Sequence, residues 1–259
     1  MDVDGLLLDI DGVLSVSWEP IADSVDTLWW LREQGIPFRL ITNTTTHTRD
    51  ALAYTLRDAG FAVEASEIVT AVVATAEYLR THHAGARVFL LSDGDAREDL
   101  EEVKLVGPNE PADVVVIGGA SDEFTYPSLN HVFQLLMGGA ALVGMHRNMF
   151  WRTTDGLELD GGAYIAGLEE AAGTKATVCG KPAPTYFHAA LDVLGVPAAR
   201  AAMVGDDVVN DVLGAQEIGM IGVLVRTGKF RPIDLERDDV APDYVIDSFA
   251  GLPTLLRTT

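Results

Sequence analysis

Short apolar segments alternate with helical patterns along almost the whole chain. Strands that alternate with helices form βαβ units, in which the crossover helix makes consecutive strands run parallel. The sequence therefore predicts an α/β fold built on parallel sheets. The expected strands are 5–10, 37–42, 68–71, 87–91, 113–117, 141–145, 176–179, 202–204, 221–225 and 244–246, and the expected helices are 24–34, 49–59, 72–80, 126–137, 164–172, 184–194 and 209–218.

The alternating pattern restarts in the middle of the chain. Residues from about 74 to 175 form a self-contained α/β block, whose loops are rich in Gly, Asp and Arg. This block separates two sets of strands that can join in one sheet, and 259 residues are enough for two domains. We therefore expect one domain made of 1–73 and 176–259, with a second domain, 74–175, inserted into it.

The chain is strongly acidic, with a net charge of −21 and a pI of about 4.4. Such a surface repels nucleic acid and anionic membranes, so we expect neither as a partner. An anionic substrate would need a local cation to reverse the field, and a bound divalent metal ion would do so. Adaptation to high salt is one hypothesis for the acidity, and it predicts a higher melting temperature at molar salt. The few lysines are Lys104, Lys175, Lys181 and Lys229.

Two further observations bear on the compartment. No apolar run is long enough to span a bilayer, and the first residues lack the basic region and cleavage site of a signal peptide, so we expect a cytoplasmic protein. The single cysteine, Cys179, excludes an intramolecular disulfide. Its apolar surroundings favour a core position over a role as nucleophile.

The run GLLLDIDGVL, residues 5–14, places two carboxylates where a buried strand ends. Strand alternation directs Asp9 and Asp11 to the same side, and Gly12 permits a sharp turn. Open α/β sheets bind ligands at the carboxyl ends of their strands. Paired carboxylates there can hold a hard cation, attack an electrophile or transfer a proton. The same pattern at residues 2–5 has no strand before it, so we interpret that copy as a solvated turn.

Three later segments place polar groups in matching positions. Thr42 ends a strand and is followed by Asn43 and Thr44, which together suit a phosphate-holding turn. Lys181, in the run CGKP, follows another strand and can act as a point cation for phosphate, although a surface lysine in a turn is an equally good interpretation. In the run MVGDDVVND, Asp206 ends a strand as Asp9 does, and Asp211 follows on a helix. Acidic helix caps are the ordinary interpretation of that run, but Mg²⁺ also prefers a few carboxylates together with waters.

Taken together, the four segments resemble the motifs of the haloacid dehalogenase (HAD) superfamily of phosphotransferases, in the same order and over almost the whole chain. The inserted block is similar to the large α/β C2 cap of the NagD-like branch. The resemblance implies a Rossmann-like catalytic core with a parallel sheet, and a cap that sets substrate choice. The chain keeps both Asp9 and Asp11, as most active phosphatases of the superfamily do.

The resemblance also implies a role for each matching position. Asp9 would attack phosphorus and form an aspartyl-phosphate, while Asp11 would act as general acid and base. Mg²⁺ would be bound by the Asp9 carboxylate, the Asp11 carbonyl and Asp206, with Asp211 holding its waters. The phosphoryl oxygens would be gripped by Thr42, Asn43, Thr44 and Lys181.

The cap has its own candidate substrate readers, Arg147 and Arg152, which could each hold an anionic group, although solvated loop cations explain them equally well. His146 is more simply a polar loop residue than a base. The leading hypothesis is a Mg²⁺-dependent phosphatase of small phosphorylated metabolites or pyrophosphate. A phosphotransferase or mutase, and a non-enzymatic phosphate-binding regulator or scaffold, remain open. A homodimer through the cap, frequent in this branch, is also left open.

Overall fold

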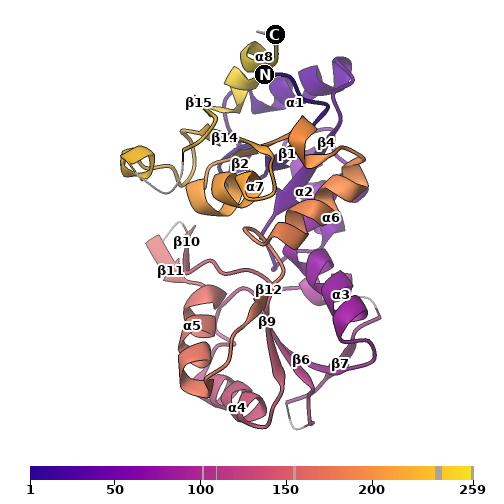
Figure 1. Cartoon of the computed structure of the whole chain (residues 1–259), viewed down its shortest axis with the longest axis vertical. Coiled ribbons are helices and arrows are strands. Elements are labelled where there is room, and N and C mark those ends of the chain that lie inside the picture. The colour runs from indigo at the N-terminus through magenta and orange to yellow at the C-terminus, as the bar shows by residue number, and fades with distance from the viewer. Residues whose placement is uncertain (101, 109, 154–155, 237–240, 258–259) are drawn as a thin grey trace. The chain divides into compact units, whose positions relative to one another are not determined.

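The computed structural model describes residues 1–259 except 101, 109, 154–155, 237–240 and 258–259, and describes only the backbone of 96, 151–153 and 156–157. The chain divides into two compact units. The first unit contains residues 1–42, 49–69 and 181–259, and the second contains 43–48 and 70–180. Each unit is built on its own parallel sheet, so the predicted α/β fold is confirmed (Figure 1).

The first unit is built on a six-stranded sheet in the order β15-β14-β13-β1-β4-β5. The pairings described in register, β1 with β13 and β4, and β14 with β13 and β15, are all parallel. The strands are β1 (Gly5–Asp9), β4 (Phe38–Thr42), β5 (Ile68–Thr70), β13 (Ala201–Gly205), β14 (Ile221–Val225) and β15 (Tyr244–Ile246). The helices include α1 (Ser24–Glu33), α2 (Arg49–Asp58), α6 (Pro184–Leu194), α7 (Gly214–Gln216) and α8 (Leu252–Arg257).

The central strand β1 is buried along its whole length. On one face, Leu6 and Leu8 join a core with apolar residues of α1, α2 and α8. On the opposite face, α6 packs against β1 and β4. Because both faces are covered, the strand is a continuous apolar run, as buried parallel strands are. Only its carboxyl end is left for polar groups, and Asp9 occupies it.

The second unit has a five-stranded sheet in the order β12-β9-β8-β6-β7, with parallel pairing throughout. Alternate residues of its strands face two separate cores: Val114 and Val116 pack with α3, and Val115 and Ile117 pack with α4 and α5. Burial of both faces explains why β8 reads as four consecutive apolar residues. The elements are α3 (Ala71–His82), β6 (Arg87–Leu91), β7 (Lys104–Val106), β8 (Val114–Ile117), α4 (Tyr126–Met137), β9 (Ala141–Gly144), α5 (Gly161–Ala172) and β12 (Thr177–Val178).

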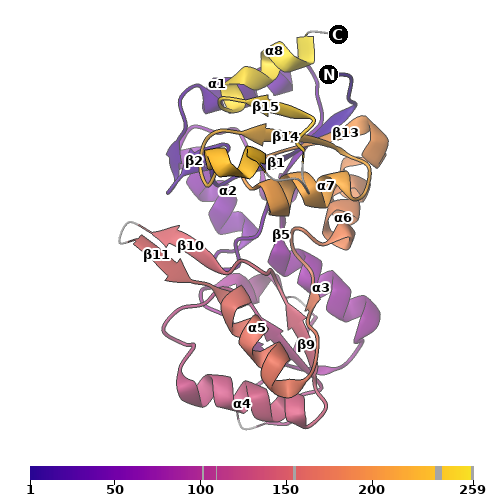
Figure 2. The ribbon, with the colours of Figure 1, turned by 60° about the vertical axis from the view of Figure 1, so that its left-hand side comes forward.

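Several elements were not predicted from the sequence. An antiparallel hairpin, β10 (Phe150–Thr153) with β11 (Gly156–Leu159), lies beside α5 (Figure 2). Helix α5 begins at Gly161, three residues before its expected start, because Asp160 caps it by accepting a hydrogen bond from the Gly161 N–H. The small pair β2 (Ser15–Val16) and β3 (Glu19–Pro20), the edge strand β7 and helix α8 are also additions.

The expected helix over 209–218 takes a different form. Residues Val208–Leu213 make a π-helical turn, and only Gly214–Gln216 is α-helical. π-helical turns are rare and occur frequently at functional sites. This turn carries Asp211, and it follows directly after β13.

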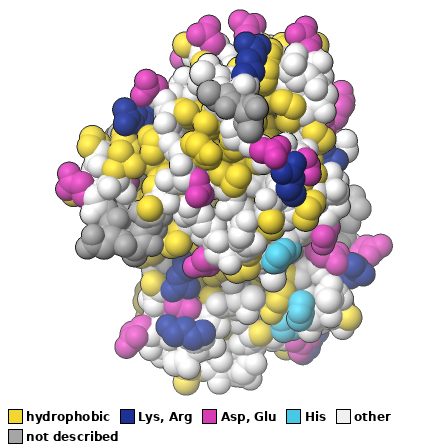
Figure 3. Space-filling model, turned by 45° about the horizontal axis from the view of Figure 1, so that its top comes forward, with side chains coloured by type: hydrophobic (Ala, Val, Ile, Leu, Met, Phe, Trp, Pro, Cys, Tyr) yellow, Lys and Arg dark blue, Asp and Glu magenta, His cyan; other side chains and the backbone are white. Residues whose placement is uncertain are grey.

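On the face drawn in Figure 3, acidic side chains lie at separate points among polar and apolar atoms. Within the described ranges, none of the helices has the length and apolar character that a membrane-spanning helix needs.

Candidate active site

Three adjacent strands of the first unit bring predicted site residues to one edge of the sheet. In the parallel register, Leu8 lies beside Val204 and Asp9 beside Ile41. Asp9 therefore ends β1 at the same level at which β13 leads into Asp206 and β4 ends in Thr42. Asp9, Thr42 and Asp206 are all buried. The expected convergence at the carboxyl ends of parallel strands is the geometry observed.

Lys181 lies between two of the carboxylates. Its Nζ is 2.8 Å from Oδ1 of Asp9 and 2.7 Å from Oδ1 of Asp211. The lysine side chain is only 4% exposed, so its charge is held inside the protein. Burial alone would lower the pKa of Lys181, but the Asp211 and Asp9 carboxylates outweigh it and raise the pKa. Lys181 is therefore a permanent cation at this edge of the sheet, and not a solvated turn residue.

Asp9, Asp206 and Asp211 form a buried acidic group, with one carboxylate oxygen from each within 4.8 Å of the others. Burial, followed by the repulsion of Asp9, raises the pKa of Asp206 well above its ordinary value. Burial also raises the pKa of Asp211 to about 7, although Lys181 opposes the shift. When all three carboxylates are ionised, one buried ammonium leaves an excess of negative charge, which adds to the effect of burial in raising these pKa values.

One atom of this group fits a bound cation. Among the described residues, Oδ1 of Asp206 is a buried oxygen with no hydrogen-bond partner. A buried carboxylate oxygen without a donor is costly, and a hard divalent cation supplies the missing charge. The donor set consists of carboxylate oxygens alone, which suits Mg²⁺ rather than a softer metal ion.

The π-helical turn fixes Asp211 toward this group. Asp207 caps the turn: its Oδ1 accepts from the N–H groups of Val209 and Asn210, at 3.0 and 2.9 Å. In return, the Asp207 N–H donates to Oδ2 of Asp211 at 3.1 Å. Burial alone would raise the pKa of Asp207, but the charge of Lys229, followed by the hydrogen bonds from Asn210 and Val209, holds it below its ordinary value. Asp207 thus stays ionised and orients Asp211 without joining the acidic group.

A loop after β14 completes the site, and the sequence analysis gave it no role there. The Lys229 N–H donates to Oδ2 of Asp206 at 2.7 Å, and the Thr227 hydroxyl donates to the carbonyl of Gly12. Nζ of Lys229 lies 4.0 Å from Oδ2 of Asp207. We call residues 227–229 the strap. A signal was present, because two of the four lysines in this acidic chain lie at the site.

Two glycines allow the strap and the turn after β1 to approach Asp206. Both have positive φ, 82° at Gly12 and 63° at Gly228. A Cβ at either position would lie 2.0 Å from Oδ2 of Asp206. Each of these positions therefore requires glycine for two reasons: the positive φ and the close approach to Asp206.

The boundary between the two units falls within the expected phosphate-holding turn. Thr42 belongs to the first unit, whereas Asn43 and Thr44 belong to the second. Asp11 lies just beyond β1, forms a bridge with Ser15 and is partly exposed, unlike Asp9. Partial exposure suits a group that exchanges protons with a substrate and water.

In the second unit, Arg147 is already engaged by an acidic partner. Its two terminal nitrogens lie 3.1 and 2.6 Å from the carboxylate of Glu169. His146 is buried, and its Nδ1 accepts from the Asn148 N–H at 3.2 Å, with Nε2 3.7 Å from Asp160. The substrate-reading role of Arg147 stays a prediction. Arg152 lies in β10, and its side chain is outside the described part of the structure.

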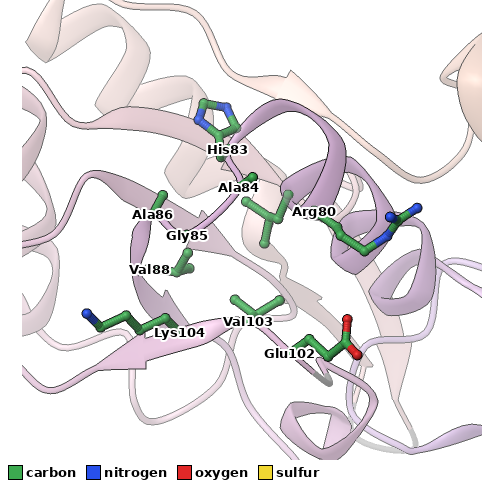
Figure 4. Close-up of a pocket in the computed structure, with 10 residues that line it drawn as sticks. Arg80, His83, Ala84, Gly85, Ala86, Val88, Glu102, Val103 and Lys104 are labelled. Atoms are coloured by element: carbon green, nitrogen blue, oxygen red, sulfur yellow. The ribbon is translucent and has the colours of Figure 1, made fainter.

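The second unit also contains a cavity of about 120 Å³ (Figure 4). It lies between the carboxyl end of α3, the start of β6 and strand β7. Arg80, His83 and Lys104 are among its lining residues, and Glu102 is the acidic one. None of the residues that line it is a predicted site residue, so we do not assign it to the active site.

Comparisons with known proteins agree with this geometry. A family model for haloacid dehalogenase-like hydrolases matches residues 6–106, and a HAD-hydrolase-like model matches residues 178–252. The chain is 37% identical to the phospholysine phosphohistidine inorganic pyrophosphate phosphatase of Mus musculus, over 98% of this chain and 94% of that protein. It is 36% identical to the human haloacid dehalogenase-like hydrolase domain-containing protein 2, over 94% and 92%.

Solved structures give the same result. The p-nitrophenyl phosphatase from Archaeoglobus fulgidus is 29% identical with a TM-score of 0.91, covering 99% of this chain and 100% of its own. NagD from E. coli K-12 is 25% identical with a TM-score of 0.86, covering 96% and 98%. A glycerol phosphate phosphatase from Mycobacterium tuberculosis, in complex with magnesium, is 26% identical with a TM-score of 0.87, covering 97% and 76%. The chain therefore belongs to the haloacid dehalogenase-like hydrolases, in their NagD-like subfamily, and is a phosphatase.

Proposed function

We propose that this phosphatase is Mg²⁺-dependent and hydrolyses small phosphomonoesters or pyrophosphate through an aspartyl-phosphate on Asp9, with Asp11 as general acid and base. The observation that carries the proposal is the buried group of Asp9, Asp206 and Asp211 against Lys181 at the carboxyl ends of adjacent strands. It combines a nucleophile with fixed positive charge and with oxygen ligands for a hard cation.

In the first step, a carboxylate oxygen of Asp9 forms a bond to phosphorus as the bond to the leaving oxygen breaks. The hydrogen bond from the Ile10 N–H and the ion pair with Lys181 both use Oδ1 of Asp9, at 2.8 Å each. This leaves Oδ2 to face the phosphorus atom. Asp11 donates its proton to the leaving oxygen, which departs as an alcohol or phenol from a phosphomonoester and as inorganic phosphate from pyrophosphate.

In the second step, Asp11 takes a proton from a water molecule, and the water oxygen bonds to phosphorus as the bond to Asp9 breaks. Inorganic phosphate leaves, and the Asp9 carboxylate and the protonated Asp11 are restored. Lys181 and Thr42 would hold the phosphoryl oxygens through both steps, with Asn43 and Thr44 contributing where the chain continues from β4.

The acidic group would hold Mg²⁺ through Asp9, Asp206 and the Asp11 carbonyl, with Asp211 orienting its waters. When bound, the ion neutralises negative charge on the carboxylates and on the transferring phosphoryl group. Two observations support this assignment: Oδ1 of Asp206 has no hydrogen-bond partner in the part of the chain that the structure describes, and buried carboxylates outnumber the buried ammonium group. The Lys229 N–H would keep Asp206 oriented by holding its other oxygen.

We further propose that the first unit is the catalytic core and the second a C2-type cap, which limits access of water and selects the substrate. The similar phosphatases are named for action on p-nitrophenyl phosphate, glycerol phosphate and inorganic pyrophosphate. These three compounds form the first panel to test. A homodimer through the cap and a cytoplasmic location stay predictions.

The test is phosphate release from p-nitrophenyl phosphate with Mg²⁺ and with excess chelator. We expect turnover that requires Mg²⁺ and that falls to background in Asp9→Asn. Asp2→Asn is the matched control, because Asp2 takes the place of Asp9 in the same Asp-x-Asp-Gly pattern without a strand before it and should leave turnover unchanged. Normal turnover in chelator, or in Asp9→Asn, would contradict the proposal.

A further inference from the structure

Tyr186 is a fully buried tyrosine in the first turn of α6. Its hydroxyl accepts from the Thr42 N–H at 3.1 Å and lies 2.9 Å from the Thr42 carbonyl oxygen. It lies 2.6 Å from the carbonyl oxygen of Val69. A single side-chain oxygen therefore contacts the backbone of two neighbouring strands, β4 and β5.

A tyrosine hydroxyl has one proton to donate, and its lone pairs can accept. The Tyr186 hydroxyl therefore accepts from the Thr42 N–H and donates to the nearer carbonyl, that of Val69. These two hydrogen bonds link the ends of β4 and β5. This bridge lies where both segments end, because Thr42 and Val69 are the last residues of their segments in the first unit, and the chain then passes into the second unit. The bridge fixes the position at which the Thr42 side chain leaves the sheet.

The location of Tyr186 links it to the proposed chemistry. It follows Lys181 on the same short segment, so one segment supplies the buried cation and holds the neighbouring strand end. Burial raises the pKa of Tyr186, although Lys181 opposes the shift, so the hydroxyl remains protonated and can donate. The aromatic ring is also packed beside Phe187, which fixes its direction.

We infer that Tyr186 is a positioning residue, which holds the Thr42 backbone and so places the Thr42 hydroxyl against the phosphoryl oxygens in the transition state. This inference rests on the proposed function. It requires that loss of the Tyr186 hydroxyl affect turnover only when the Thr42 side chain is present. A purely structural tyrosine would instead lower activity to the same extent with or without Thr42.

The experiment is a double-mutant cycle of Tyr186→Phe and Thr42→Ala, with kcat and KM measured for p-nitrophenyl phosphate at saturating Mg²⁺. We expect Tyr186→Phe to lower kcat by about ten- to a hundredfold, since small misplacements of positioning groups have effects of this size. In the Thr42→Ala background, the further loss should be less than about twofold. Tyr54→Phe, at an exposed tyrosine of α2, is the matched control and should not change kcat.

Two outcomes would overturn the inference: wild-type kcat in Tyr186→Phe, or an equal loss in both backgrounds. If Tyr186→Phe does not fold, 4-aminophenylalanine at position 186 keeps the ring and a donor but is a poor acceptor for the Thr42 N–H. Its kcat should fall several-fold, again only when Thr42 is present, and an unchanged kcat would count against the inference.

Failure of the proposed function can be told apart from failure of this inference. If wild-type protein shows no Asp9-dependent turnover, the proposed function fails. The cycle is then repeated with binding of inorganic phosphate, measured by calorimetry with Mg²⁺ present. Weaker phosphate binding in Tyr186→Phe that disappears in the Thr42→Ala background would support the inference, and equal binding by wild type and Tyr186→Phe would overturn it.

Discussion

Replacing Asp206 with asparagine should stabilise the metal-free protein and remove its stabilisation by Mg²⁺. One carboxylate oxygen from each of Asp9, Asp206 and Asp211 lies within 4.8 Å of the others. Two unit charges at that distance repel by about 3.5 kcal/mol at an effective dielectric constant near 20. Asparagine removes one charge and keeps the shape, and its amide oxygen can still accept from the Lys229 N–H.

The expected gain is smaller than the full repulsion. Wild-type protein already relieves part of it by protonation, because burial and Asp9 raise the pKa of Asp206, and the pKa of Asp211 is about 7. We expect a net gain of about 1–2 kcal/mol for metal-free Asp206→Asn at pH 7. For a chain of this length, that gain corresponds to roughly 2–8 °C in melting temperature.

The assay is thermal unfolding followed by circular dichroism, with chelator and with Mg²⁺. At a Mg²⁺ concentration of about 100 times Kd, wild type should gain about 2.7 kcal/mol, and Asp206→Asn should gain almost nothing. Asp192→Asn, at an exposed position of α6, controls for the change in net charge. The reasoning is refuted if metal-free Asp206→Asn melts below wild type, or if Mg²⁺ stabilises the variant as it does wild type.

Three other predictions follow from the same contacts. Gly228→Ala should weaken Mg²⁺ binding measured by calorimetry, because the added Cβ would collide with Oδ2 of Asp206. Gly35→Ala is the control: Gly35 has a similar φ of 67° but open space where its Cβ would lie, so this variant should lose only stability. Equal Mg²⁺ affinity in wild type and Gly228→Ala would contradict the prediction. Glu169→Gln should destabilise the second unit by about 1–3 kcal/mol, because the buried carboxylate holds Arg147. The hydrogen bonds from Arg147 outweigh burial and lower the pKa of Glu169 from 4.5 to about 2. The carboxylate therefore contributes its full share of the free energy of unfolding above pH 4.5, and this share is lost as the pH falls through 2. If Glu169→Gln loses as much stability as wild type over that pH range, another group is responsible. Burial raises the pKa of Cys179 to about 12, so a thiol reagent at pH 8 should label it only after unfolding, and rapid labelling of folded protein would show that the thiol is accessible.

The convergence of the site could be predicted from the sequence because it depends on local pattern alone. Apolar runs identify parallel strands, and parallel strands place their carboxyl ends at one edge. Asp9, Thr42 and Asp206 follow from that rule without knowledge of any contact. Lys181 was ambiguous in the sequence, since a lysine in a turn is usually solvated, and only its ion pairs with Asp9 and Asp211 reveal its burial.

Residues that act through backbone contacts could not be predicted in this way. The strap donates to Asp206 and to the Gly12 carbonyl from a loop more than two hundred residues after β1, and no local pattern encodes such a contact. Tyr186 reads as an ordinary apolar position of α6. The π-helical turn carrying Asp211 has the sequence of an α-helix, and its form depends on the capping bonds of Asp207.

The central claim is covalent catalysis by Asp9, and the most direct test is to trap the phosphorylated enzyme. Wild-type protein with Mg²⁺ and a small phosphomonoester is quenched in acid on the millisecond scale, and its peptides are analysed by mass spectrometry. The account predicts a phosphoryl group on Asp9 that forms and decays at rates compatible with turnover and is absent from Asp9→Asn. Turnover without any phosphorylated Asp9, or a phosphoryl group on another residue, would contradict it.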